Sequence, residues 1–147
     1  MRFMTIVKGS ENLAASGPPP AELVEAIGRL IEEEAKKGTM VSFGGLKPTS
    51  AGVRMRITNG EIITVDGPFT ESKEVIGGFS IMNAASKEEA LEEGRIFMEL
   101  HRVHWPKWQG ELEIRLMYEQ EDDVQAAQIE GSRVIENVGG VRSHVAR

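Results

Sequence analysis

Asp66 is the residue of this 147-residue chain best placed to perform acid–base chemistry, because it stands where an apolar run meets the turn Gly67-Pro68-Phe69. An aspartate before Gly-Pro commonly accepts backbone amides and locks a turn. If the carboxylate instead lines an apolar pocket, desolvation would suit it to general acid or base catalysis. The candidate walls of such a pocket are Met55, Thr64, Phe69 and Phe79. The sequence leaves the structural and the catalytic hypotheses open.

The segment after this turn offers hydrogen-bond donors. Thr70, Ser72 and Lys73 could bind an anionic or carbonyl ligand, although Thr-Glu-Ser-Lys is also typical of a solvated loop. Together with the aromatic and thioether side chains nearby, they define the predicted ligand-binding residues. These are Met55, Phe69, Ser72, Lys73 and Phe79.

A second group of chemically capable residues is His101, His104, Trp105 and Trp108. Two histidines at i and i+3 can share a helical face and ligate a metal, but Pro106 ends the helix close by and only Glu99 could add a carboxylate at helical spacing. We therefore predict no metal site. The tryptophans are expected to cover the end of the core or a dimer surface, with His104 bonded locally or bordering a cleft. We place both histidines in the connection between the second helix and the last strand.

Two amphipathic helices are expected to support these residues. The first follows Pro20, faces the core with Leu23, Ile27, Leu30 and Ile31, and ends at Gly38. Glu34 continues the same 3.6-residue spacing. The second begins with the capping box Ser86-Lys87-Glu88-Glu89. Its predicted buried stripe is Ala90, Leu91, Gly94, Phe97 and Met98.

The remaining apolar runs predict strands over 3–8, 40–46, 53–58, 61–66, 75–82 and 111–118. Asn59-Gly60 separates two of these runs by only two residues, which indicates a hairpin whose turn needs positive φ at both positions. The resulting order is β-α-β-(β-hairpin)-β-α-β. This order predicts an α+β fold, a ferredoxin-like split βαβ with an inserted hairpin.

Composition limits the classes of function. The chain has no cysteine, which excludes disulfides, thiolate nucleophiles and cysteine-bound zinc. Its net charge of −6 divides into −3 for residues 1–118 (14 basic, 17 acidic) and −3 for residues 119–147 (3 basic, 6 acidic), so direct nucleic-acid binding is not expected. Without a signal-like N-terminus or a long apolar run, a cytoplasmic protein that does not cross a membrane is expected.

The domain prediction follows from the same patterns. Residues 1–118 carry all the periodic segments and are expected to form one domain. Residues 119–147 are acidic and poor in aromatic side chains, which predicts a flexible or loosely docked tail with room for a short helix near 124–129.

The stretch from Val65 to Phe79, Val-Asp-Gly-Pro-Phe-Thr-Glu-Ser-Lys-Glu-Val-Ile-Gly-Gly-Phe, resembles the signature of the DGPF group of YCII-related proteins. Matching pieces run from Phe3 to about Leu116. The resemblance implies a dimer of the dimeric α/β-barrel type, formed by packing sheet against sheet. It also implies a His/Asp pair in a cleft, here Asp66 with His101 or His104, and a functional link to extracytoplasmic-function sigma factors.

Two functions follow as hypotheses. In the first, the chain is a small-molecule-binding or regulatory module that forms a homodimer. In the second, it is an enzyme without metal or organic cofactor, in which Asp66, together with His104, moves a proton on a small carbonyl-containing metabolite.

Overall fold

The computed structural model describes residues 1–9, 17–69, 74–119 and 128–130 and has a mixed α+β architecture, as predicted. In chain order the elements are β1 (Arg2–Gly9), α1 (Ala21–Lys37), β2 (Met40–Gly45), the 3-10 turn η2 (Thr49–Ala51), β3 (Val53–Thr58), β4 (Glu61–Asp66), β5 (Val75–Asn83), α2 (Lys87–His104) and β6 (Glu111–Leu116). They divide into two compact units. One unit contains Met1–Arg54 and Val65–Met117, and the other contains Met55–Thr64 and Tyr118–Arg147.

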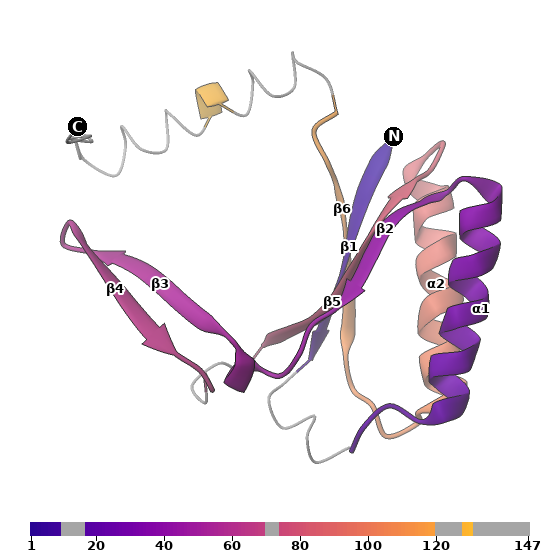
Figure 1. Cartoon of the computed structure of the whole chain (residues 1–147). Coiled ribbons are helices and arrows are strands. Elements are labelled where there is room, and N and C mark those ends of the chain that lie inside the picture. Colours follow the sequence, from indigo (N-terminus) through magenta and orange to yellow (C-terminus); the bar gives the residue numbers. More distant parts are fainter. Residues whose placement is uncertain (10–16, 70–73, 120–127, 131–147) are drawn as a thin grey trace. The chain divides into compact units, whose positions relative to one another are not determined.

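The first unit is built on a four-stranded sheet in the order β2-β5-β1-β6, with every neighbouring pair antiparallel. β1 and β5 are the central strands, although they are separated in sequence by α1, β2 and the hairpin. Both α1 and α2 lie on the same side of this sheet (Figure 1). The chain therefore forms two layers, one of helices and one of strands.

The helix ends have the capping interactions that the sequence predicts. Gly38 ends α1 in the left-handed conformation at φ 77°, where glycine carries no steric penalty. At the start of α2, the Ser86 hydroxyl accepts the Glu89 amide at 3.1 Å, and the Glu89 carboxylate accepts the Ala85 amide at 2.9 Å. These reciprocal bonds fix the direction in which α2 leaves the sheet.

Two details of the second helix differ from the prediction. Leu91 is 41% exposed, because the buried stripe of α2 is narrower than expected and runs through Ala90, Gly94 and His101. The two histidines belong to the last turn of α2, since the helix continues to His104. Their placement in the connection to β6 was therefore wrong.

The sheet has two unlike faces. On the helix side, Phe3, Met82, Ala84 and Ala90 form the buried cluster, with Ile114 packed against it. On the opposite side, cross-strand pairing aligns Met4 with Ile81 and Ile6 with Phe79. These four apolar side chains are only half-buried.

The β3–β4 hairpin forms a separate two-stranded sheet. Its strand bounds and its turn agree with the prediction, and Asn59 and Gly60 have φ of 50° and 79°. Its large apolar side chains are strongly exposed, with Met55 at 74%, Ile57 at 77% and Ile62 at 71%. In the second unit, residues 128–130 are helical.

Candidate functional site

The Asp-Gly-Pro-Phe turn packs tightly against the 3-10 turn η2. Gly67 donates its amide to the Gly52 carbonyl at 2.9 Å, and Phe69 donates its amide to the Thr49 hydroxyl at 3.1 Å. A Cβ added at Gly67 would overlap the Thr49 carbonyl group, so only glycine fits at this position. The motif therefore joins two loops that are distant in sequence.

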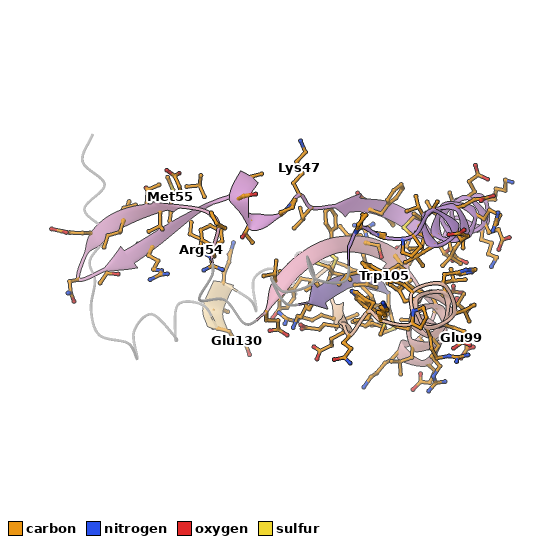
Figure 2. The ribbon with its side chains drawn as sticks, turned by 90° about the horizontal axis from the view of Figure 1, so that it is seen from below. Lys47, Arg54, Met55, Glu99, Trp105 and Glu130 are labelled. Atoms are coloured by element: carbon orange, nitrogen blue, oxygen red, sulfur yellow. The ribbon has the colours of Figure 1, made fainter. Side chains whose placement is uncertain are left out.

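Phe69 anchors this joint. Its side chain is only 6% exposed, and the Arg54 guanidinium lies over the ring at 3.9 Å from the centroid (Figure 2). A cation at this distance is attracted by the ring quadrupole. Because its ring is covered in this way, Phe69 contributes to the stability of the turn rather than to an open pocket.

The other predicted residues near this turn are dispersed. Asp66 is exposed, and Met55 projects from the hairpin with 74% of its surface exposed. Ser72 and Lys73 fall outside the described residues. Among the described residues, none therefore encloses the Asp66 carboxylate in the desolvated environment proposed for it.

Substitution of Asp66 separates its structural and catalytic hypotheses. Because the side chain is exposed, we expect Asp66→Asn to change the free energy of unfolding by no more than about 0.5 kcal/mol. Urea denaturation at neutral pH measures this directly. A loss of roughly 1 kcal/mol would instead show that the charged carboxylate locks the turn.

The first unit contains a cavity of about 900 Å³ between the helix layer and the sheet. Its walls are mostly apolar and come from α1, α2 and the strands, chiefly from the helix-facing side of the sheet. Phe79, which lies on the opposite face, also borders the cavity. The lining residues include Val7, Leu23, Ile27, Leu30, Ile31, Met40, Phe43, Phe79, Met82, Phe97 and Leu112. A volume of this size is in the range of sites for small organic molecules.

Two hydroxyl groups interrupt the apolar floor of this cavity. Thr5 on β1 and Ser80 on β5 are cross-strand partners, and their side-chain oxygens lie 2.6 Å apart. Thr5 is 6% exposed and Ser80 is half-buried. They are the middle pair of a helix-facing row that begins with Phe3 opposite Met82.

One end of the cavity is aromatic. The His101 ring lies 4.5 Å from Phe97 and 4.5 Å from Trp108, and Trp105 stacks on Trp108 at 6.2 Å. Figure 2 shows Trp105 at the end of α2 on the side of the strands, whereas Glu99 points away from them. The tryptophans thus cover the end of the core, as one of the two predictions for them stated.

His101 is held as a neutral imidazole. Burial lowers its pKa, and the hydrogen bond to the Phe97 carbonyl opposes this shift only in part. Because a carbonyl can only accept, Nδ1 carries the proton that it donates to Phe97 at 3.0 Å. Nε2 is left as the ring nitrogen that can accept a bond from a ligand in the cavity.

The helix side of the cavity contains a carboxyl pair, Glu34 and Glu93, joined by a hydrogen bond. Burial favours protonation of Glu34, but hydrogen bonds from Thr39 and Lys37 outweigh it and hold the pKa of Glu34 below its ordinary value. Burial and the neighbouring Glu34 charge raise the pKa of Glu93. Glu93 therefore holds its proton more tightly than Glu34 does.

Only part of this cavity was predictable. Phe79 and His101, both predicted site residues, line it, whereas Asp66, Phe69 and His104 are not among its lining residues. Sequence reasoning missed Thr5, Ser80 and Glu93. Glu34 could have been recognised from the sequence as an unusual residue, because it occupies a position where the helical spacing predicts an apolar side chain.

No set of three His, Cys, Asp or Glu side chains in the described ranges is close enough to hold a metal ion. Of the helices in the same ranges, none has the length and apolar character needed to cross a membrane.

The fold defines the class of protein as a two-layer α+β domain, and a mostly apolar cavity lies between its layers. The model of the YCII-related domain matches residues 1–95, and the chain belongs to this family. It is also 39% identical over 72 residues to an uncharacterized protein of Rhizobium meliloti (strain 1021), a match that covers 49% of this chain. The chain spans 56% of the length of that relative.

Proposed function

We propose that the protein is a small-molecule-binding module whose ligand occupies the cavity between the helix layer and the sheet. The cavity itself, about 900 Å³ with mostly apolar walls, is the observation that carries the proposal. Densely packed cores contain few voids larger than a water molecule. An apolar molecule that fills a space this large stabilises the protein, because the side chains of the walls otherwise have no dispersion contacts on that side.

The proposed assembly is a homodimer of ferredoxin-like subunits of the dimeric α/β-barrel type. The strand order β2-β5-β1-β6 supports the ferredoxin-like assignment. The half-buried row of Met4, Ile6, Phe79 and Ile81 on the face opposite the helices supports the dimer, because a second sheet would bury it. In this proposal residues 1–118 form the dimerising domain and 119–147 the tail.

A regulatory role is the second part of the binding proposal. The resemblance to DGPF proteins supports a link to a sigma factor, and a partner of that kind would place the protein in the cytoplasm. Occupation of the cavity would then be the signal that the partner reads.

One observation favours an enzyme as the second candidate. The neutral His101 imidazole lines the cavity and has Nε2 available, as a general base requires. In this version His101 is the base in the cavity. Asp66 and His104, the other two predicted catalytic residues, do not line the cavity and would act from a separate cleft that a second subunit completes, without metal or organic cofactor. Its substrate would be a small carbonyl-containing metabolite.

Filling the cavity tests the binding proposal. Val7 lies on the floor two residues from Thr5 and pairs with Gly78 and Leu112. We expect Val7→Phe to abolish binding of the uncharged apolar dye Nile red while leaving the melting temperature unchanged or raised. Inserting a larger side chain into a filled core would instead lower stability by about 1–3 kcal/mol.

Dye fluorescence and thermal melts of both forms provide the measurements. Val7→Ala is the matched control, since it enlarges the same space and should still bind the dye. A parent protein that fails to bind Nile red, or a strongly destabilised Val7→Phe protein, would contradict the proposed cavity site.

A further inference from the structure

From the Thr5–Ser80 hydroxyl pair and the charges around it we infer the chemical class of the ligand: an uncharged amphiphile with an apolar body and one hydroxyl or carbonyl group. This inference rests on the proposed function, because it names what the cavity between helices and sheet selects. The pair would bind the polar group of the ligand on the cavity floor.

The position of the pair is the first support. Thr5 and Ser80 lie on the two central strands, and the next helix-facing residues on either side are the apolar Phe3 and Val7 of β1 and Met82 of β5. Polar groups in an apolar surface lower stability unless they are bonded. Valine in place of Thr5 and alanine in place of Ser80 would satisfy the packing of the cavity floor. The two hydroxyl groups therefore have a role other than packing.

The bonding capacity of the pair is the second support. Each hydroxyl has one proton and two acceptor lone pairs. The 2.6 Å bond between Thr5 and Ser80 uses one of the two protons. One donor and several lone pairs therefore remain, which matches a ligand carbonyl or hydroxyl. Sites for small molecules commonly combine apolar walls with a few polar groups of this kind.

The charges around the cavity oppose an anionic ligand. Two lysines line the cavity. Lys8 lies 2.5 Å from Glu113, 3.7 Å from Glu111 and 3.9 Å from Glu74, so its charge is compensated on the sheet, and Lys47 is exposed with its side chain extending away from the strands (Figure 2). Lys37 pairs with Glu34 at 3.1 Å.

A cationic ligand is opposed by the state of the carboxyl pair. Glu34 already has Lys37 and the Thr39 hydroxyl as partners, and the pKa of Glu93 is raised. The Glu34 carboxylate is therefore already compensated by its partners, and little of its charge is left for an ammonium group. Burying an unpaired charge among apolar walls is costly, so an uncharged ligand is favoured over either ion.

Three probes with the same ten-carbon tail test this class: decanol, decanoate and decylammonium. Displacement of Nile red gives their affinities. Tryptophan emission gives a second readout, because the chain has two tryptophans, Trp105 and Trp108, and both line the cavity. We expect decanol to bind at least about tenfold more tightly than either ion.

Removal of the hydroxyls then tests their role. The double variant Thr5→Val/Ser80→Ala should weaken decanol binding roughly fivefold and leave thermal stability equal or higher, since both partners of the bond are replaced by apolar groups of similar shape. Ser80→Ala alone is the milder variant should the double variant fail to fold. Ser42→Ala is the matched control, because Ser42 pairs with Ile81 on the opposite face and should leave the affinity unchanged.

The outcomes separate the two proposals. If neither Nile red nor any of the three probes binds, the proposed function fails and this inference fails with it. If Nile red binds but decanoate or decylammonium competes as well as decanol, only the ligand class is overturned. The same holds if decanol affinity survives removal of the Ser80 hydroxyl.

Discussion

Gly67→Ala is expected to destabilise the protein by about 3 kcal/mol or more. The added Cβ would overlap the Thr49 carbonyl group, which is backbone and cannot rotate away. Relief requires the Asp-Gly-Pro-Phe turn to separate from η2. That movement would break the bonds from Gly67 to Gly52 and from Phe69 to Thr49.

Chemical denaturation of parent and variant measures this effect, and Gly77→Ala provides the matched control. A Cβ at Gly77 meets nothing within 4 Å, so that variant should be as stable as the parent or slightly more stable. Equal stability of the Gly67→Ala variant and the parent would show that the turn does not pack on η2 as described. The motif would then need a different role.

Ile81→Lys is expected to convert the protein from a dimer to a monomer. Ile81 pairs with Met4 on the sheet face opposite the helices, in the row that the proposed second subunit covers. A lysine there would place an unpaired charge in the interface, at a cost on the order of 3 kcal/mol of association free energy. Exposed to water in the monomer, the same lysine would be tolerated.

Sedimentation at micromolar concentration distinguishes the two states. Val103→Lys serves as the control, because Val103 is an exposed apolar residue of α2 at 56% and should leave association unchanged. A parent protein that sediments as a 16.2 kDa monomer would remove the dimer proposal altogether. A dimeric Ile81→Lys protein would place the interface on another surface.

The sequence predicted those parts of the fold that depend on neighbours in the chain. The Asn59-Gly60 turn, the Ser86 capping box and the Gly38 helix end all agree with the structure. Each is decided by backbone conformations and hydrogen bonds within a few residues. The bounds of β3 and β4 followed from the same local information.

The candidate site was less accessible to such reasoning. Asp66 and Phe69 attracted attention because of their motif, yet in the structure Asp66 is exposed and Phe69 is buried beneath Arg54. Thr5 and Ser80 are ordinary strand residues in sequence. They become a ligand contact in the proposal only because β1 and β5 are neighbours in the sheet, although Thr5 and Ser80 are 75 positions apart in the chain.

The sequence by itself determined the α+β class, the succession of helices and strands, the hairpin turn and the membership signature around Asp66, because these features depend on local conformational preference and on periodicity. Tertiary structure alone decided that Gly67 meets Thr49, that Glu93 meets Glu34, and that the helix layer leaves a cavity above the sheet. Such contacts join segments that are distant in the chain. The distances between the contacting residues depend on how whole helices and strands pack, which no local pattern of residues specifies.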